Sequence, residues 1–276
     1  MNPAGEGRAK PGPVVRTTLR TADGVPIEAV HVPCAVPSRD SGTPGPHPVA
    51  IVVAHGFTGS ADRPAVRRAA TAFAQRAGVI TFSFRGHGRS GGRSTVGDRE
   101  VLDLDAAVAW ARALGYPRVA TVGFSMGGSV VLRHAALGAA GPGGRTEART
   151  DAVAAVSAPA RWYYRGTAPM RRLHWVVTTP AGRLVARAGL GTRISGARWS
   201  PVPLAPYEAV PLIAPTPVLV VHGDRDPYFP LDHGHMLAAA GPAELWVERG
   251  MGHAENAVDD DLLARLADWL AVTAVR

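Results

Sequence analysis

The sequence predicts an α/β fold in which a doubly wound, mostly parallel sheet carries a small lid insertion. Short continuous apolar runs alternate along the chain with longer segments whose apolar residues recur at helical spacing. Such alternation is typical of strands that helices bury on both faces and that right-handed crossovers connect. The alternation stops after Pro159 and resumes at Val218, which indicates an insertion between two parts of one domain.

The first part of the chain predicts a hairpin, a buried strand and a helix. Residues 14–19 and 27–32 are short strand patterns on either side of the turn sequence Ala22-Asp23-Gly24. Residues 49–54 are apolar throughout, as expected for a strand buried on both faces. Residues 63–77 carry apolar residues at helical spacing, so we expect a helix there.

The same pattern then repeats on both sides of the insertion. The expected strands are residues 79–84, 119–122, 153–157, 218–221 and 244–247. The expected helices are residues 98–114, 126–137, 231–240 and 259–272. A Gly-rich connection over residues 138–151, which we expect to be mobile, links the helix at 126–137 to the strand at 153–157.

This pattern divides the chain into a core, a lid and a tail. We expect residues 14–160 and 215–276 to form the core, with a Pro, Gly and Ser loop over residues 38–48. Residues 161–214 lack a strand pattern and hold many aromatic, Pro and Arg residues, so we interpret them as the lid. Residues 1–13 are polar and rich in Gly and Pro, which predicts a disordered tail.

Composition favours a globular protein that needs no disulfide. Hydrophobic residues make up 46% of the chain and charged ones 19%, enough apolar material to bury a large core. Cys34 is the one cysteine, which excludes an intramolecular disulfide and a cysteine-based metal cluster. The tail has no apolar signal segment, and no run approaches the roughly 20 apolar residues of a membrane span. We therefore expect a cytoplasmic protein without stable membrane insertion; the sequence does not indicate the oligomeric state.

The positive charge does not indicate a nucleic-acid partner. The chain has a formal net charge of +8 and a sequence pI near 10.6. Lys10 is the one lysine, and the arginines are scattered without a basic helix or a zinc-finger spacing. We therefore expect no nucleic-acid binding.

The sequence Gly123-Phe124-Ser125-Met126-Gly127-Gly128 lies between an expected strand and an expected helix. A strand-to-helix turn this tight leaves no room for side chains beside its apex, which explains the glycines that flank Ser125. Such a turn presents a serine hydroxyl as a nucleophile. We therefore expect Ser125 at the apex of a nucleophile elbow.

A serine hydroxyl is a weak nucleophile and requires a general base that a carboxylate orients. His253 follows the last expected strand in a Gly-rich loop, which favours it as the base. Asp224 and Asp226 both follow the strand at 218–221, where the carboxyl end of a parallel strand opens toward the ligand-binding crevice. Either aspartate completes the order Ser, Asp, His along the chain.

The oxyanion of an acyl-transfer intermediate requires backbone donors. The Gly-rich turn that begins at His55 follows the strand at 49–54 and directs the amide of Phe57 toward the site, beside the amide of Met126. We predict these two amides as the oxyanion hole. For His55 we favour a structural role that braces this turn.

These motifs resemble the α/β-hydrolase superfamily. The resemblance rests on residues 123–128, the turn His55-Gly56-Phe57, and the segments at 85–91, 223–226 and 252–253. It extends over about residues 48–276. Within the superfamily the chain is similar to the serine-aminopeptidase-like and monoacylglycerol-lipase-like branch, which includes cinnamoyl and feruloyl esterases.

The resemblance implies three further assignments. The acid of the branch corresponds to Asp226 rather than Asp224, the run at 85–91 is structural, and the insertion after the sixth strand forms a cap that contributes to the substrate pocket. Trp162 and Tyr163 are candidates for that pocket, although aromatic residues in an insertion also pack the lid onto the body.

Two groups of polar residues leave alternatives open. Four arginines lie near the start of the insertion: Arg161, Arg165, Arg171 and Arg172. The alternatives are that they contact an anionic leaving group, that they contact a lipid surface, or that they form a solvated basic face, and we favour the last. His233 and His235 lie at the start of an expected helix, but no third ligand has a spacing that favours a metal site.

The sequence thus predicts a serine hydrolase that cleaves a carboxylic ester of a small molecule through an acyl-enzyme intermediate, without a cofactor or a metal. The same triad serves a thioesterase, an aminopeptidase or amidase, and an acyltransferase. Because Ser125 occupies the elbow, the chemistry of those superfamily members whose nucleophile is an aspartate at this position is not expected. A non-catalytic binding protein of the same fold is the alternative from another class, and it predicts a damaged triad.

Overall fold

A computed structural model describes residues 12–35, 47–139 and 148–276. Most of the expected tail, most of the expected loop at 38–48 and the centre of the connection at 138–151 lie outside the described residues. In the described part of the chain, no helix is both long and apolar enough to cross a membrane.

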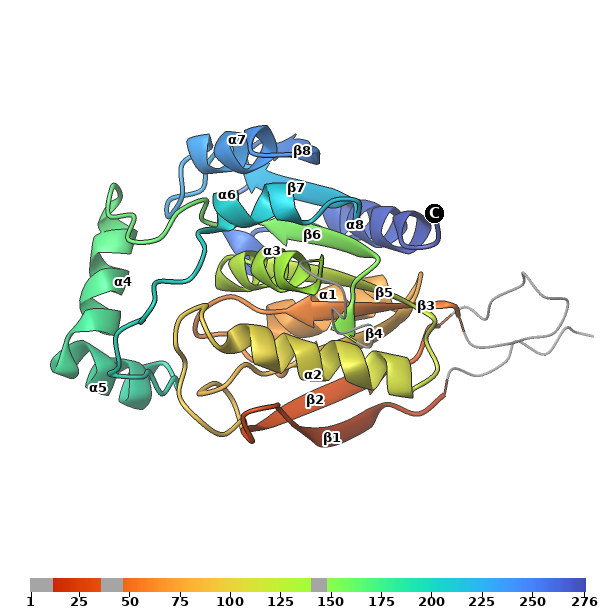
Figure 1. Cartoon of the computed structure of the whole chain (residues 1–276), viewed down its shortest axis with the longest axis horizontal. Coiled ribbons are helices and arrows are strands. Elements are labelled where there is room, and N and C mark those ends of the chain that lie inside the picture. Colours follow the sequence, from red (N-terminus) through yellow and green to blue (C-terminus); the bar gives the residue numbers. More distant parts are fainter. Residues whose placement is uncertain (1–11, 36–46, 140–147) are drawn as a thin grey trace, which may run out of the picture.

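The centre of the molecule is an eight-stranded sheet with the order β1-β2-β4-β3-β5-β6-β7-β8 (Figure 1). The first two strands form an antiparallel hairpin at one edge, and β2 is antiparallel to β4, whereas β3 to β8 run parallel. The strands are β1 (Val15–Arg20), β2 (Pro26–Val32), β3 (Val49–Ala54), β4 (Gly78–Phe82), β5 (Arg118–Phe124), β6 (Ala152–Val156), β7 (Val218–Gly223) and β8 (Ala243–Glu248). The predicted hairpin and the predicted doubly wound, mostly parallel sheet are confirmed.

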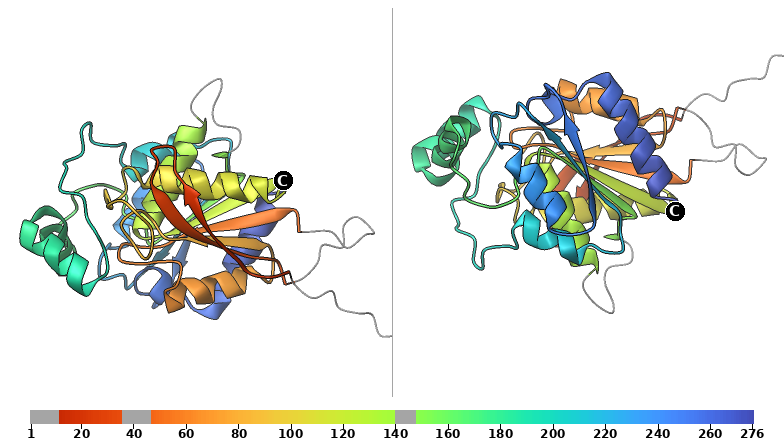
Figure 2. Two further views of the ribbon diagram at one scale, coloured as in Figure 1. Left: turned by 90° about the horizontal axis from the view of Figure 1, so that it is seen from below. Right: turned by 90° about the horizontal axis from the view of Figure 1, so that it is seen from above.

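Helices cover both faces of this sheet (Figure 2). One face carries α1 (Pro64–Phe73) and α8 (Asp260–Thr273), together with the short η3 (Ala254–Asn256). The other face carries α2 (Glu100–Ala113), α3 (Met126–Ala139) and α7 (Asp232–Ala239). The arrangement follows from the apolar strands, because a strand buried on both faces needs a helix layer on each side.

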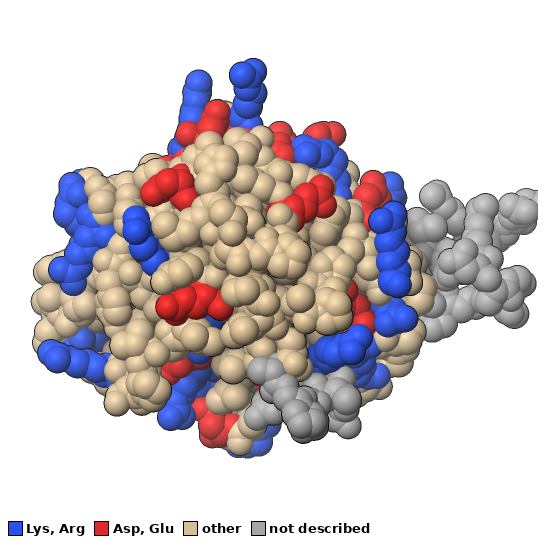
Figure 3. Space-filling model, turned by 45° about the horizontal axis from the view of Figure 1, so that its top comes forward, with Lys and Arg blue, Asp and Glu red and all other residues tan. Residues whose placement is uncertain are grey.

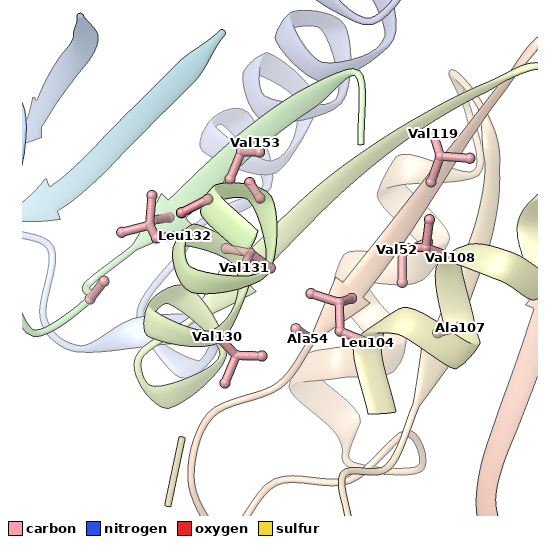
Figure 4. Close-up of a cluster of buried hydrophobic side chains, with 14 of the residues drawn as sticks. Val52, Ala54, Leu104, Ala107, Val108, Val119, Val130, Val131, Leu132 and Val153 are labelled. Carbon is pink, nitrogen blue, oxygen red and sulfur yellow. The ribbon is translucent and has the colours of Figure 1, made fainter. Parts of the chain in front are cut away.

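The core consists of two layers, one on each face of the sheet, and successive residues of a strand point alternately into one layer and the other. In β3, Val52 and Ala54 belong to the layer beneath α2 and α3, whereas Ile51 and Val53 belong to the layer beneath α1 and α8. Figure 4 shows Val52 and Ala54 beside side chains of α2 and α3. This two-sided burial holds the carboxyl ends of the strands rigidly, and the candidate site lies there.

The expected elements differ from the observed ones mainly at their ends. The helix expected over 63–77 ends at Phe73, because residues 74–76 form turns. The strand expected over 79–84 ends at Phe82. Beyond that strand, the amide of Phe84 donates to the His55 ring instead of a neighbouring strand.

The segment after β6 holds two helices that the sequence pattern did not indicate. They are α4 (Ala168–Thr178) and α5 (Pro180–Gly189), a helical hairpin next to the carboxyl ends of the parallel strands (Figure 1). The side chains of Thr167 and Thr179 cap their N-termini by accepting hydrogen bonds from Met170 and Gly182. Each helix also begins with a proline near its first position, where a missing amide hydrogen costs nothing.

The end of the same segment packs into the body of the molecule. Here α6 (Pro206–Ala209) and η2 (Val210–Leu212) contact α3, and the fully buried side chains of Ala209 and Ile213 join the core. These residues fall within the range 161–214 that the sequence pattern assigned to the lid. They pack as part of the core because their apolar side chains fill the groove beside α3.

Candidate active site

Ser125 stands between β5 and α3 in a strained backbone conformation. Its φ is 52°, a left-handed value that a residue with a side chain rarely adopts. Its amide donates to the Val156 carbonyl (2.8 Å), and its carbonyl accepts from the Ser129 amide (3.2 Å). These bonds hold the turn against β6 and present the Ser125 hydroxyl at the carboxyl end of the sheet.

The glycines beside Ser125 permit close packing of three backbone segments. A Cβ at Gly123 would lie 2.1 Å from the Gly127 carbonyl oxygen, and a Cβ at Gly127 would lie 2.2 Å from the Ala54 carbonyl oxygen. Contacts of that length do not occur, so any side chain would push β3, β5 and α3 apart. The glycine spacing in the sequence is therefore a steric requirement of the turn.

We expect Gly127→Ala to lower the free energy of unfolding by about 3 kcal/mol, because its methyl group meets backbone that cannot move without disturbing the sheet. Gly138→Ala, on the same helix, is the matched control. A Cβ there meets nothing within 4 Å among the described residues, so we expect a change within about 1 kcal/mol, in the stabilising direction. Urea unfolding of both variants measures the difference, and equal stability of the two would contradict the steric argument.

The structure brings together Ser125, His253 and Asp226, the three residues predicted as a triad. The His253 ring lies with Nε2 2.9 Å from the Ser125 Oγ and Nδ1 2.7 Å from the Asp226 Oδ2. The Tyr228 ring lies against the imidazole, with centroids 4.4 Å apart. The geometry is therefore that of a serine bonded to a histidine whose other nitrogen faces a carboxylate.

Asp226 is oriented by its own turn. Its buried carboxylate accepts hydrogen bonds at Oδ1 from the amides of Tyr228 (2.8 Å) and Phe229 (3.0 Å), which leaves Oδ2 directed at His253. His222 Nε2 lies 4.0 Å from the same Oδ2 but donates to the Phe229 carbonyl, and burial lowers the pKa of His222. The carboxylate therefore faces a neutral His222 on one side and His253 on the other.

Asp224, the other aspartate of this loop, points elsewhere. Its Oδ1 accepts a hydrogen bond from the Gly250 amide at 2.6 Å, which joins the loops after β7 and β8. Gly250 has a φ of 74°, so it makes the turn that leads toward His253. Asp224 thus has a structural partner and does not contact the imidazole.

The turn after β3 places Phe57 beside Ser125 and Met126, and all three line one cavity. Within the described residues, the amides of Phe57 and Met126 donate to no backbone acceptor in a turn or loop. His55 braces the turn: its Nε2 accepts from the Phe84 amide (3.0 Å), and its Nδ1 donates to the Gly56 carbonyl (2.7 Å). These contacts agree with the structural role favoured for His55.

The buried position of His55 predicts a pH dependence of stability. Burial lowers its pKa to about 3 in the folded protein, below the ordinary value near 6.5. The folded state therefore binds fewer protons than the unfolded state, so stability is fully present above about pH 6.5 and decreases as the pH falls toward 3. By pH 5 we expect His55 to account for a loss of about 2 kcal/mol.

Urea unfolding at pH 7.5 and pH 5 measures this loss in the wild type, in His55→Asn and in His235→Asn, whose side chain is exposed. We expect His55→Asn to lose less stability on acidification than the other two proteins. The same loss in all three would refute the assignment to His55.

Glu255 is a site residue that the sequence did not indicate. Its buried carboxylate accepts a hydrogen bond at Oε1 from the Gly56 amide (3.0 Å), 199 positions away in the chain. A Cβ at Gly56 would lie within 3.4 Å of both the Glu255 carboxylate and the Ser125 Cβ. Glu255 therefore fixes the turn that carries Phe57 against the segment that carries His253. Its position two residues after His253 is the one signal in the sequence.

A cavity of about 560 Å³ opens from Ser125 toward α4 and α5. The body contributes Phe57, Met126, Ser129 and Phe229, and the segment after β6 contributes most of the remaining wall. The buried hydroxyl of Ser129 has no hydrogen-bond partner in the described residues, although it lies one helical turn from Ser125. The cavity is large enough for a small-molecule substrate.

Trp162 and Tyr163 line this cavity and also pack the segment after β6. The Trp162 Nε1 donates to the Pro203 carbonyl (2.9 Å), and its ring lies edge-on to Trp199, with centroids 5.1 Å apart. Tyr163, with a φ of 60°, lies 5.6 Å from the same Trp199 ring. Trp162 and Tyr163 therefore both line the cavity and pack the segment.

The two histidines considered as metal ligands lie in different environments. His233 is buried and accepts a hydrogen bond from the Ala160 amide (2.9 Å), whereas His235 is exposed. Among residues 12–35, 47–139 and 148–276, no three His, Cys, Asp or Glu side chains are grouped as metal ligands would be.

The sheet carries a serine, a histidine and an aspartate, joined by hydrogen bonds, at the carboxyl ends of its strands. This combination is typical of α/β hydrolases. The chain belongs to the alpha/beta hydrolase family, which it matches over residues 51–269. This match confirms the resemblance to the superfamily, whereas the narrower branch stays a prediction. No curated protein matches the chain in sequence.

Solved structures share the fold over almost the whole chain. The esterase Pf2001 of Pyrococcus furiosus is 22% identical, with a TM-score of 0.66 over 94% of this chain and 92% of that one. The alpha/beta hydrolase GrgF of Penicillium sp. is 19% identical, with a TM-score of 0.70 over 96% and 100%. Est1E of Butyrivibrio proteoclasticus, solved with ferulic acid bound, is 17% identical, with a TM-score of 0.61 over 94% and 99%.

Proposed function

We propose that this protein is a serine hydrolase that cleaves a carboxylic ester through an acyl-enzyme. The observation that carries the proposal is the pair of hydrogen-bond distances at His253, 2.9 Å to the Ser125 Oγ and 2.7 Å to the Asp226 Oδ2. The proposal also rests on the cavity that opens at Ser125. Esterases among the structures of the same fold support it further.

In the acylation step the Ser125 Oγ attacks the ester carbonyl carbon while His253 Nε2 takes the hydroxyl proton. The carbonyl oxygen becomes an oxyanion, which the amides of Phe57 and Met126 bind in the cavity. Asp226 accepts a hydrogen bond from His253 Nδ1 and stabilises the imidazolium. The intermediate collapses when His253 returns the proton to the leaving alkoxide, which departs as the alcohol.

In the deacylation step a water molecule replaces the alcohol. His253 Nε2 removes a proton from that water as its oxygen attacks the acyl carbon, and the same two amides bind the second oxyanion. The bond from the acyl carbon to Ser125 then breaks, and His253 gives the proton to the Ser125 Oγ. The acid is released and the enzyme regains its initial state.

The shape of the cavity suits the acyl part of a small ester. The wall of the cavity is mainly apolar side chains, and the acyl group of a small ester fits a volume of about 560 Å³. A thioester or an amide uses the same triad, and an acyltransferase differs in the access of water, so these activities are outcomes of the test.

The test is a panel of matched acyl donors. We expect hydrolysis of p-nitrophenyl acetate, butyrate, octanoate and dodecanoate, with an optimum chain length set by the cavity. The thioester and anilide of the best acyl group are measured beside them. If the protein turns over the thioester and the anilide faster than the ester, the ester assignment is wrong and the preferred donor takes its place.

Covalent labelling separates an enzyme from a binding protein of the same fold. A fluorophosphonate reacts with a serine that a neighbouring histidine activates. We expect the intact protein to be labelled at Ser125 and the unfolded protein to be unlabelled. A folded protein that resists the probe and hydrolyses no member of the panel would favour the non-catalytic alternative.

A further inference from the structure

The positive charge of the chain is concentrated in the segment that covers the candidate site. The sequence has 30 Lys and Arg residues and 22 Asp and Glu residues. Residues 161–204 hold eight of the arginines and none of the acids, so the rest of the chain is formally neutral. In Figure 3, Lys and Arg side chains lie along the left end of the molecule, where α4 and α5 lie, whereas those at the top and right lie beside Asp and Glu side chains.

Part of this charge lies at the wall of the cavity. Three arginines line it, namely Arg161, Arg183 and Arg198, whereas its lining holds no Asp or Glu. A positive site without a carboxylate attracts an anionic ligand, and the low-dielectric walls of a cavity strengthen that attraction.

The three arginines differ in how their charge is balanced. Arg161 lies at the rim, 4.0 Å from the exposed Asp232 carboxylate, and its guanidinium stacks over the Tyr164 ring at 5.9 Å. Arg183 donates to the carbonyls of Val177 (3.3 Å) and Thr178 (3.2 Å), which orient it, and its charge has no acidic partner among the described residues.

Arg198 lines the cavity two positions after Gly196, and it has no hydrogen bond or ion pair in the part of the chain that the structure describes. A Cβ at Gly196 would lie 3.7 Å from the Arg183 Nη2. Arg183 and Arg198 therefore supply to the cavity lining two guanidinium groups that no carboxylate of the described residues pairs with. A guanidinium binds a carboxylate through parallel N–H donors, and the charge assistance strengthens each bond.

We propose that the substrate carries a carboxylate in addition to the ester, and that Arg183 and Arg198 bind this carboxylate while Ser125 attacks the ester. The inference rests on the proposed function and specifies its substrate class. Arg171 and Arg187 do not line the cavity, so the inference assigns no binding role to them.

Two pairs of esters test the inference, because the carboxylate belongs either to the acyl part or to the alcohol part. The acyl pair is monomethyl adipate and methyl hexanoate; the alcohol pair is 4-acetoxybenzoate and 4-tolyl acetate. Each pair exchanges a carboxylate for a methyl group of similar size. We expect kcat/KM for the anionic member of one pair to exceed that of its neutral partner by about tenfold at low salt.

The variants assign the preference to the two arginines. We expect the double variant Arg183→Gln, Arg198→Gln to lower kcat/KM for the preferred anionic ester about tenfold and to leave the neutral ester within about twofold. Arg183→Lys keeps the charge but loses the parallel N–H donors, so it should retain part of the preference. Arg187→Gln, on the same helix but outside the cavity wall, is the matched control and should change neither ester.

The outcomes separate this inference from the proposed function. Hydrolysis of the neutral esters without a preference for either anionic ester overturns the carboxylate assignment and leaves the hydrolase intact. An equal loss with both members of a pair, or the same loss in Arg187→Gln, also overturns it. A wild type that hydrolyses no ester overturns both proposals. As an independent check, the preference should decrease from about 20 mM to about 500 mM salt, because salt screens the charges.

Discussion

Replacement of Ser125 by alanine is expected to lower kcat for the best ester by about 10⁶-fold. The variant keeps every backbone contact of the elbow and loses only the hydroxyl that lies 2.9 Å from His253 Nε2. Because alanine experiences the same backbone strain at this position as serine, we expect the folded state to persist. Steady-state hydrolysis of the p-nitrophenyl series, with circular dichroism as a check on folding, measures the effect.

Ser129→Ala is the matched control for this experiment. Ser129 lines the same cavity one turn further along α3, and its hydroxyl is buried without a partner in the described residues. We expect its kcat to stay within about threefold of the wild type, since its hydroxyl does not contact His253. A residual activity above about 1% in Ser125→Ala would show that another group is the nucleophile.

The second large effect is expected for Asp226→Asn, with a decrease in kcat of about 10⁴-fold. An asparagine keeps the size of the side chain and its contacts with the amides of Tyr228 and Phe229. It removes the negative charge that stabilises the imidazolium and permits the wrong tautomer of His253. Measurement of kcat and KM separately should show the loss in kcat.

Asp224→Asn gives the comparison, because Asp224 is two residues away and bonds to Gly250 instead of His253. We expect kcat within a few-fold of the wild type and a loss of about 1 kcal/mol in the free energy of unfolding. If Asp224→Asn lowers kcat more than Asp226→Asn does, the acid has been assigned to the wrong aspartate.

The features that were predictable from sequence are those that local patterns determine. A continuous apolar run such as residues 49–54 implies burial on both faces, and the Gly-x-Ser-x-Gly spacing around Ser125 is a local motif, although the contact that requires Gly127 is with the distant Ala54 carbonyl. The position of His253 was predictable because it follows the last strand of the repeat. The structure places these residues together, as the order along the chain suggested.

The features that were not predictable depend on contacts between distant parts of the chain. The helices α4 and α5 were not predicted because the aromatic, Pro and Arg residues around them obscure the helical spacing. The role of Glu255 was not predicted because its partner, Gly56, is 199 residues away. The short helices at Pro206–Leu212 were not predicted because their apolar residues become core only when α3 lies beside them.

The long separation between Ser125 and His253 has a consequence for experiments on assembly. The two residues are 128 positions apart, and the segment carrying α4 and α5 lies between them. A chain divided within this segment gives one fragment with the nucleophile and the Phe57 turn, and another with the acid and the base. The fragments would meet along the parallel register of β6 and β7, where Val153 pairs with Val218. If the proposed function holds, ester turnover in such a mixture would report fragment complementation, as a split-enzyme sensor requires.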